Sequence, residues 1–451
     1  MEYTRQLAQF AVQLKYSDIP SDVIEKAKEF ALHAWGVQLA CSTLPWSKSV
    51  FRYTQGQGGN PHSTVLNYGL KTSTVNAAFT NGAFGHGFEM DDNHAATSTK
   101  CGSVVIPAAL AIGEQHTCSG QDFILATVIA VEIMTRVALS VTPALSLRGI
   151  HPTGSCGPFG AAASTGKLLG FDESMMLNAL SIAGAHSAGL QEAPPSGRGH
   201  LKRIFGGMAS ASGVRAGLLA AEGLTGPDTM LEGEKGFCRA FGNSLNLIQL
   251  TSGLGVDWQI QRIHYKIYAQ DGYIQPMSEA LGNIMQQHVI NPNEIEEIVA
   301  GTNGHAHNQV IGLIREPKDL TSAQFSANFS LALFIIKGNA GFHEYSDESL
   351  SDPRIIELSK RIRTEIDDEV ELEWQKSKPR GARITIRMKS GAIYTEYIHN
   401  LRSMTNDDVN KKFLRLANVA LPSEKCESLL HISRNLETVK DISKVASLLA
   451  K

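Results

Sequence analysis

The chain has 451 residues, of which 43% are hydrophobic and 19% charged. This composition is typical of a folded globular protein, and the length predicts two or three domains rather than one core. The 41 basic and 44 acidic residues give a formal net charge of −3, which argues against a nucleic-acid partner or a polybasic membrane surface.

Several features predict a soluble, cytoplasmic protein. The first twenty residues are amphipathic and lack the uninterrupted apolar run of a signal peptide. The most apolar long segment, residues 123–141, contains Glu132 and Arg136, so no membrane span is expected. The six cysteines are scattered without a CxxC pair, which indicates reduced, buried thiols rather than a disulfide framework.

The first 250 residues have the pattern of consecutive helices. Residues 21–40 begin with Ser21 and acidic residues in the first turn, followed by apolar residues at helical spacing. Later helical segments are rich in Gly and Ala: 74–87, 104–114, 159–170, 176–189 and 208–223. Small residues at helical spacing allow helices to approach closely, so we interpret most of them as packing residues.

The pattern changes after about residue 258. Residues 294–305 predict a helix end that runs into a strand, and residues 382–398 predict two alternating strands around a turn at 389–391. Helical segments are expected at 326–338 and 351–362, and the helical pattern returns from about residue 402.

The predicted fold class is mainly α, with a large all-α helical domain and a smaller α+β domain. The predicted boundaries are 1–258 for the helical domain, 259–398 for the α+β domain, and 399–451 for a helical tail that packs back on the first domain.

Four short stretches concentrate polar side chains in apolar, Gly-rich surroundings. They lie near residues 85–110, 149–164, 194–213 and 263–276. Their candidate groups for chemistry are Glu89, Asp91, Asp92, His94, His151, Arg198, His200, Lys202, Arg203, His264, Lys266, Tyr268 and Tyr273. Acids and imidazoles next to cationic groups suit proton transfer beside a carboxylate, which needs a base, an acid and cations for the developing charge.

Other interpretations of the same residues remain open. Asp91 and His94 would share one helical face and could bind a metal, although no HExxH or CxxC motif supports this. Cys156 could be a nucleophile, but no local signature marks an activating base. The same residues could instead have structural roles. Asp91 or Asp92 could cap a helix, His94 or His151 could be a buried core residue, and Lys202 and Lys266 could lie on the surface.

Taken together, the stretches resemble the MmgE/PrpD family. The resemblance is carried in order by GHGFEMDDNH, GSVVIPAALAIGE, GIHPTGSCGPFGAAAS, TGKLLGFDE, GLTGPDTMLEGEKGF, YKIYAQDGYIQP and AQFSANFSLALFIIKG, over about residues 5–430. The family includes dehydratases, decarboxylases and epimerases of small carboxylic acids. The resemblance implies an all-α domain, a smaller α+β domain, a homodimer and no required organic cofactor.

The resemblance also implies roles for individual residues. Catalytic roles fall to His151 as the main acid/base group, to Lys202 and Lys266 as carboxylate-binding cations, and to Asp91 and His94, which tune the site. Substrate-binding roles fall to Glu89, Asp92, Thr99, Lys100, Arg203 and Tyr268, and no metal ligand is predicted.

The chain departs from the family pattern at several proton-carrying positions. Thr99 and Lys100 replace a second His-Pro pair, and Phe205 replaces a histidine. Gln275 stands where His often precedes proline, and Phe329 where many members have tyrosine. These departures are compatible with a different substrate, with a branch that uses fewer acid/base groups, or with lost activity.

Three functional interpretations follow. The first is a cofactor-independent lyase, of the dehydratase or decarboxylase type, that acts on a small polycarboxylate. The second is an epimerase or isomerase that removes and returns one proton, and therefore needs one fewer acid. The third is a carboxylate-binding homologue without activity. A metal-dependent hydrolase is the least favoured alternative.

Overall fold

The structure is a computed structural model that describes residues 2–192, 199–242 and 246–451. The chain divides into two compact units. The first comprises Met1–Gln191, Leu201–Tyr265 and Met404–Lys451, and the second comprises Glu192–His200 and Lys266–Ser403. The first unit thus extends beyond residue 258 and includes the C-terminal segment. The predicted combination of a large helical part and a smaller mixed part is confirmed.

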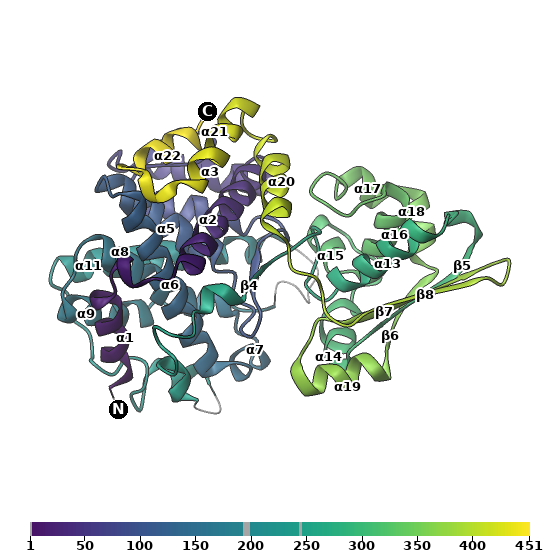
Figure 1. Cartoon of the computed structure of the whole chain (residues 1–451), viewed down its shortest axis with the longest axis horizontal. Helices are drawn as coiled ribbons and strands as arrows, with labels where there is room; N and C mark the ends of the chain where they lie inside the picture. Colours follow the sequence, from purple (N-terminus) through teal and green to yellow (C-terminus); the bar gives the residue numbers. More distant parts are fainter. Residues whose placement is uncertain (1, 193–198, 243–245) are drawn as a thin grey trace. The chain divides into compact units, whose positions relative to one another are not determined.

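Helices make up most of the first unit (Figure 1). They are α1 (Tyr3–Gln13), α2 (Ser21–Ser42), α3 (Pro45–Gln57), α4 (Thr74–Gly85), α5 (Gly102–Gln115), α6 (Gly120–Val141), α7 (Ala144–Leu147), α8 (Pro152–Leu168), α9 (Glu173–Gly184), α11 (Phe205–Ala221), α12 (Phe237–Phe241), α20 (Asn406–Ala417), α21 (Ser423–Arg434) and α22 (Ser443–Leu448).

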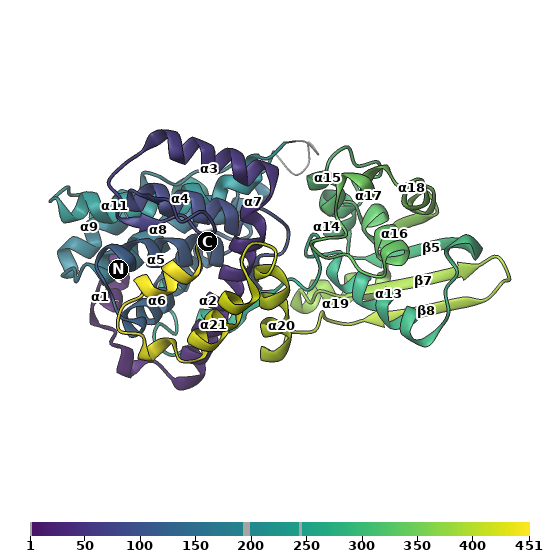
Figure 2. The ribbon, with the colours of Figure 1, turned by 90° about the horizontal axis from the view of Figure 1, so that it is seen from above.

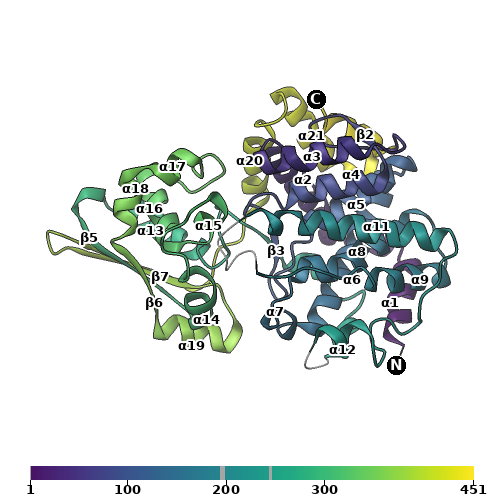
Figure 3. The same ribbon diagram turned by 180° about the vertical axis from the view of Figure 1, so that it is seen from behind.

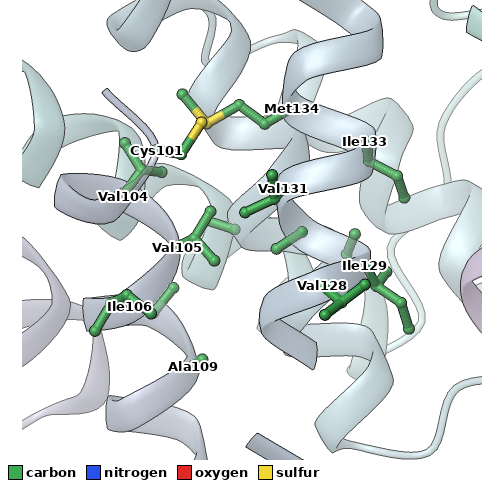
Figure 4. Packing of buried hydrophobic residues seen from close by; sticks show 14 of the residues in the cluster. Cys101, Val104, Val105, Ile106, Ala109, Val128, Ile129, Val131, Ile133 and Met134 are labelled. Carbon is green, nitrogen blue, oxygen red and sulfur yellow. The ribbon is translucent and has the colours of Figure 1, made fainter. Parts of the chain in front are cut away.

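The core of this unit is built around α5 and α6. Val104 and Val105 of α5 are buried, as are Val128 and Val131 of α6 (Figure 4). Ser119 and Asp122 form a reciprocal capping box that fixes the start of α6. Burial of such aliphatic side chains contributes about 1.5–3 kcal/mol each, so this layer contributes substantially to the stability of the unit.

The helix α6 is one of two described helices that are long and apolar enough to cross a membrane. In the structure 94% of its apolar window is buried inside the protein. The two charged side chains in its interior form an ion pair in which Arg136 Nε lies 2.9 Å from Glu132 Oε2. Arg136 also donates to the carbonyls of Ser252 and Asp257, so the pair fixes a surface segment to the core helix. The second such helix, Leu201–Ala221, has 61% of its window buried.

The helices α4, α8 and α11 belong to the first unit (Figure 3), and α11 contacts both of the others. Their small residues are packing residues, as predicted. A Cβ added at Gly157 would lie 2.7 Å from Ala209 Cβ, and one added at Gly82 would lie 2.7 Å from Gly207 Cα. Contacts this short are not available to real side chains, so alanine at these sites would push the helices apart.

Two short strand pairs interrupt the helices of the first unit. The first pair joins β1 (Ser63–Thr64) to β2 (Lys71–Thr72). The second joins β3 (Asp92–His94) to β4 (Ile263–Tyr265), so that Asp92 lies opposite Tyr265. The prediction that Asp91 and His94 share a helical face is therefore wrong, because this segment is a loop that continues into an extended strand.

The second unit contains a four-stranded mixed sheet in the order β6-β5-β7-β8. The strands are β5 (Ile295–Thr302), β6 (Ile362–Ile366), β7 (Ala382–Met388) and β8 (Ile393–Ile398), and β6 runs parallel to β5. The helices are α13 (Gln275–Gln287), α14 (Gly304–Ala306), α15 (Leu320–Gln324), α16 (Ala327–Lys337), α17 (Asp347–Ser351), α18 (Pro353–Ser359) and α19 (Asp368–Ser377).

One face of this sheet is covered by helices. Ala382, Ile384 and Ile386 of β7 are buried, while the alternate residues Arg383 and Arg387 are half-buried or exposed. The helices α13 and α16 lie along the sheet and contact its strands (Figure 2). The predicted pair of alternating strands at 382–398 is confirmed, and the strand predicted near 294–305 begins at Ile295 after a 3₁₀ turn.

Candidate active site

The first of the four polar stretches begins with a loop, residues 86–91, between α4 and β3. Three side chains from distant parts of the first unit hold its backbone. Trp46 Nε1 donates to the Gly87 carbonyl at 2.8 Å, and the Arg203 guanidinium donates to the same oxygen. Lys412 Nζ, from helix α20, donates to the Met90 carbonyl at 2.8 Å. The loop that carries Glu89 and Asp91 is thereby fixed on both sides.

Glu89 pairs with Lys202 in the interior of the first unit. Lys202 lies in a 3₁₀ turn, Leu201–Ile204, directly before α11. Its Nζ forms an ion pair with Glu89 Oε1, and the two side chains are only 8% and 6% exposed. The alternative that Lys202 is a surface lysine is therefore excluded. A buried, paired ammonium group provides a fixed positive charge for an anionic ligand.

His151 lies close to this ion pair. It precedes Pro152, which begins α8. The ring of Phe205 lies 5.0 Å from the His151 ring, between ring centres. Burial lowers the pKa of His151 well below its usual value, and His86, Lys202 and Lys100 lower it further. His151 is thus neutral at pH 7 in the protein without substrate.

Asp91 holds a second histidine, His86. Asp91 Oδ2 lies 2.8 Å from His86 Nδ1, and both side chains are almost fully buried. The His86 and His151 rings meet edge to face, with their centres 5.6 Å apart. Burial lowers the pKa of His86, while the bond to Asp91 opposes this effect. His86 was not among the predicted site residues, although its position five residues before Asp91 in GHGFEMD was a usable signal.

Asp92 begins β3, and its side chain contacts the start of α5, whose N-cap residue is Cys101. Asp92 Oδ1 accepts a hydrogen bond of 2.9 Å from the Gly102 backbone N–H at the start of α5. Burial and the neighbouring Asp91 raise the pKa of Asp92 to about 7. Asp92 therefore holds the loop against α5, and its substrate-binding role stays a prediction.

His94 and Thr99 belong to a separate chain of hydroxyl groups. His94 Nδ1 lies 3.0 Å from the Thr97 hydroxyl, which lies 2.8 Å from the Thr99 hydroxyl. Burial lowers the pKa of His94 to about 4. These contacts are those of a buried core histidine. Lys100 Nζ donates to the Asn93 side chain at 2.5 Å, and its backbone N–H donates to Thr153.

Arg203 supports the loop that carries Glu89. Its guanidinium lies 4.0 Å from the centre of the Trp46 ring and bonds to the Gly87 carbonyl. The side chain is almost fully buried. Its predicted contact with substrate is untested, whereas its support of the Glu89 loop is direct. Arg198, from the same stretch, lies outside the described residues.

Lys266 and Tyr268 are part of the second unit. Lys266 is 4% exposed, so it is not a surface lysine. Gln275 Oε1 accepts from the backbone N–H groups of Ile267 and Tyr268, both at 3.0 Å. Gln275 Nε2 donates to the Tyr268 carbonyl at 2.9 Å. Gln275 therefore shapes the loop that carries the Lys-x-Tyr sequence, and the site roles of both residues stay predictions.

Phe329 lies elsewhere in the second unit. It is buried in α16, and its ring centre is 6.4 Å from that of Tyr345. The Tyr345 hydroxyl donates to Ser330 Oγ at 2.7 Å. A tyrosine ring thus lies near Phe329, the position where the resemblance predicts a tyrosine in many members.

The alternatives of a metal centre and a cysteine nucleophile find little support in the described residues. There, no group of three or more His, Cys, Asp or Glu side chains is placed to hold a metal ion. Cys156 is buried, and burial raises the pKa of its thiol to about 12. A thiol in that state is a poor nucleophile at neutral pH.

The arrangement in the first unit combines two neutral imidazoles with a buried ammonium–carboxylate pair. Lys202 supplies a fixed cation, and His151 supplies a group that can exchange a proton near it. Apolar neighbours such as Phe205 exclude water and strengthen these electrostatic interactions. The cluster is therefore suited to proton transfer on an anionic molecule.

Comparison with known proteins identifies several similar sequences along almost the whole chain. Cis-aconitate decarboxylase from Aspergillus terreus is 28% identical over 477 residues, which cover 99% of this chain and 95% of that protein. Human cis-aconitate decarboxylase is 24% identical, covering 97% of this chain and 92% of that protein. The cis-aconitate decarboxylase-like protein oryM from Aspergillus oryzae is 26% identical, covering 99% and 97%.

Two family models match most of the sequence. The MmgE/PrpD N-terminal domain matches residues 5–247, and the MmgE/PrpD C-terminal domain matches residues 268–438. The second match extends past residue 403 into helices that fold with the first unit. Since the two matches span well over half of the sequence, the chain belongs to the MmgE/PrpD family.

Proposed function

We propose that the protein is a cofactor-independent lyase that acts on a small polycarboxylate, and that cis-aconitate is the first substrate to test. The observation that carries the proposal is the buried Lys202–Glu89 ion pair beside the neutral His151. The names of the relatives support decarboxylation as the reaction type.

Decarboxylation of cis-aconitate requires few groups from the protein. Loss of carbon dioxide breaks a carbon–carbon bond and leaves the electron pair on the remaining skeleton as an allylic carbanion. That carbanion spreads onto a conjugated carboxylate and takes up one proton from the enzyme. A cation near the conjugated carboxylate and a proton donor near the carbon are therefore required.

Lys202 and His151 are assigned to these two tasks. The Lys202 ammonium stabilises the negative charge that develops on the substrate carboxylate. His151 is neutral without substrate. The negative charges of a bound polycarboxylate favour its protonated form, so His151 gains a proton on binding and delivers it to carbon. Lys266 is kept as a second carboxylate-binding residue, an assignment that rests on the family resemblance.

A pair of Lys202 variants tests the role of the cation. Lys202→Met removes the charge and leaves the Glu89 carboxylate without its ammonium partner. We expect kcat/KM to fall by about 10²–10³-fold, as when one stabilising group for developing charge is lost. Lys202→Arg keeps the charge with a different shape and is expected to retain part of the activity. Equal activity of Lys202→Met and the wild type would contradict the assignment.

The reaction type is tested by proton NMR of the metal-stripped protein in deuterated water. The panel is citrate, 2-methylcitrate, cis-aconitate, iminodisuccinate and aspartate. A lyase gives a new alkene signal or releases carbon dioxide, and decarboxylation places one deuterium on the product. Proton exchange or inversion without elimination would instead establish an epimerase. Binding without any reaction would favour the inactive, carboxylate-binding alternative.

The proposal includes a cytoplasmic location and a homodimer without nucleic-acid or membrane partners. The location rests on the sequence, and the dimer rests on the family resemblance. Light scattering coupled to size-exclusion chromatography tests the dimer, which has twice the mass of the 48.7 kDa chain. A mass equal to one chain at micromolar concentration would contradict it.

A further inference from the structure

The Asp91–His86 pair has no role in the mechanism described above, yet the His86 ring lies edge to face with the His151 ring. His86 follows the last residue of α4, and its side chain is fully enclosed. Its Nδ1 bonds to Asp91, while its Nε2 has no hydrogen-bond partner among the described residues. His151 Nδ1 likewise has none within that part of the chain. Buried imidazole nitrogens of this kind are uncommon and call for a functional explanation.

The bond to Asp91 fixes the state of the His86 ring. A carboxylate oxygen at 2.8 Å accepts the proton of Nδ1, which leaves Nε2 as the nitrogen that can gain or lose a proton. The carboxylate also stabilises the imidazolium form that arises when Nε2 is protonated. The ring centres are 5.6 Å apart, and direct proton transfer requires one nitrogen of each ring to approach the other to about 3 Å.

The charged neighbours of the two rings come from separate elements. His86 is influenced by Asp91 and Glu89 of its own loop and by Lys202 of the turn before α11. His151 is influenced by His86, Lys202, Lys100 and Glu89. Both rings therefore share the Lys202–Glu89 pair as their common electrostatic environment, so that a change in charge at one ring acts on the other.

We propose that His86, oriented by Asp91, is a second proton-carrying residue of this site, which passes its proton to His151 rather than to the substrate. This inference rests on the proposed function, because it supplies the proton that the reaction consumes. His86 acts through His151, since its side chain is enclosed and His151 lies beside it. It is thus a positioning and relay residue.

The proton balance of the relay is simple. Substrate binding favours the uptake of one proton by the pair of rings. This proton resides on His86 Nε2, and Asp91 stabilises the resulting His86 imidazolium. The His86 imidazolium then donates its Nε2 proton to His151 and becomes neutral, and His151, now protonated, gives one proton to the substrate carbon. The Nδ1 proton of His86 stays on the bond to Asp91. One proton from solvent then restores the pair, matching the single proton that decarboxylation consumes.

The variant His86→Asn distinguishes between two roles of His86, namely its hydrogen bond to Asp91 and its transfer of a proton. The asparagine amide can donate to Asp91 in place of Nδ1–H, but it has no nitrogen in the place of Nε2 and cannot become charged. We expect normal folding, a fall in kcat of about 10²-fold on cis-aconitate, and a KM within about threefold of the wild type. The fall of kcat with rising pH should begin at a lower pH than in the wild type.

Two controls accompany this variant. His116→Asn makes the same change at an exposed histidine at the end of α5 and should leave kcat, KM and the pH profile unchanged. Asp91→Asn keeps the size of the side chain but removes the charge that stabilises the imidazolium. It should lower kcat to a similar extent as His86→Asn, and the double variant should be no worse than either single one.

A readout that does not depend on turnover tests the same relay. Long-range ¹H–¹⁵N spectra of the full-length protein with ¹⁵N-labelled histidine distinguish the two neutral tautomers, and His86→Asn identifies the His86 signals. The Nδ1-protonated tautomer of His86 is expected in the wild type, and its loss or change is expected in Asp91→Asn. An Nε2-protonated neutral His86 in the wild type would overturn the inference.

The outcomes separate the two proposals. If the wild type turns over an acid of the panel and His86→Asn keeps the same kcat and pH profile, the relay is wrong while the proposed function stands. If the wild type turns over none of them, the proposed function fails, and the tautomer measurement alone decides whether Asp91 fixes His86. A selective loss of kcat in His86→Asn with a shifted pH profile supports the relay.

Discussion

The ionisation of Asp92 gives a sharp test of the electrostatics of the site loop. The substitution Asp92→Asn keeps the size of the side chain, and its amide oxygen can still accept the hydrogen bond from Gly102. Burial and the neighbouring Asp91 raise the pKa of Asp92 from 3.8 to about 7. One pKa unit corresponds to about 1.4 kcal/mol, so the ionised carboxylate destabilises the folded protein by about 4 kcal/mol at pH 8.

The sign of the effect follows from the raised pKa. The folded protein holds the Asp92 proton more tightly than the unfolded chain does, so its stability falls as the pH rises from about 4 to about 7. Asparagine lacks this penalty. We therefore expect Asp92→Asn to be more stable than the wild type at pH 8, and its advantage to grow by about 2–3 kcal/mol between pH 5 and pH 8.

Urea unfolding followed by tryptophan fluorescence measures this difference. Three of the four tryptophans, Trp35, Trp46 and Trp258, lie in the first unit. A Trp374→Phe background therefore makes the signal specific to that unit. The control Glu222→Gln changes an exposed carboxylate at the end of α11 in the same unit and should have the same small effect at both pH values. An equal effect of Asp92→Asn at pH 5 and pH 8 would refute the reasoning.

Three further predictions concern the rest of the first unit. Arg136→Met leaves Glu132 as a buried charge without its partner and should lower the unfolding free energy by about 3–5 kcal/mol, more at pH 9 than at pH 6, as measured by urea unfolding. Cys156→Ala should retain kcat/KM. In the wild type, the Cys156 thiol should react with a disulfide reagent only after unfolding, and rapid labelling of the folded protein would contradict its burial. Gly120→Ala should lower the melting temperature, because a Cβ there would overlap the Leu436 carbonyl, and an unchanged value would refute the close packing of the C-terminal segment on α6.

Periodicity was sufficient to predict most of the helices and the β7–β8 hairpin. The Gly- and Ala-rich segments are helices whose small residues permit close packing, and the alternation in 382–398 matches the buried and exposed faces of β7. The strand β6 was missed, because its alternate residues Arg363 and Glu365 are charged and the strand follows a helix without a strong turn signal.

The candidate site was predicted only in part, for a physical reason. Polar residues were located by their stretches, but their partners depend on contacts over long sequence separations. The Glu89–Lys202 pair spans 113 residues, and the contact of Lys412 with Met90 spans 322. Asp91 precedes the short strand β3 and His94 ends it, so the two side chains have different hydrogen-bond partners. Helical spacing could not predict this difference.

The measurement that tests the central claim most directly is kcat/KM of His151→Ala on the acid that the wild type converts, with circular dichroism to show that the variant is folded. If the cluster around His151 carries out proton transfer, the value should fall by about 10²–10⁴-fold, as for loss of a general acid–base residue. A folded His151→Ala protein with wild-type kcat/KM would contradict the account.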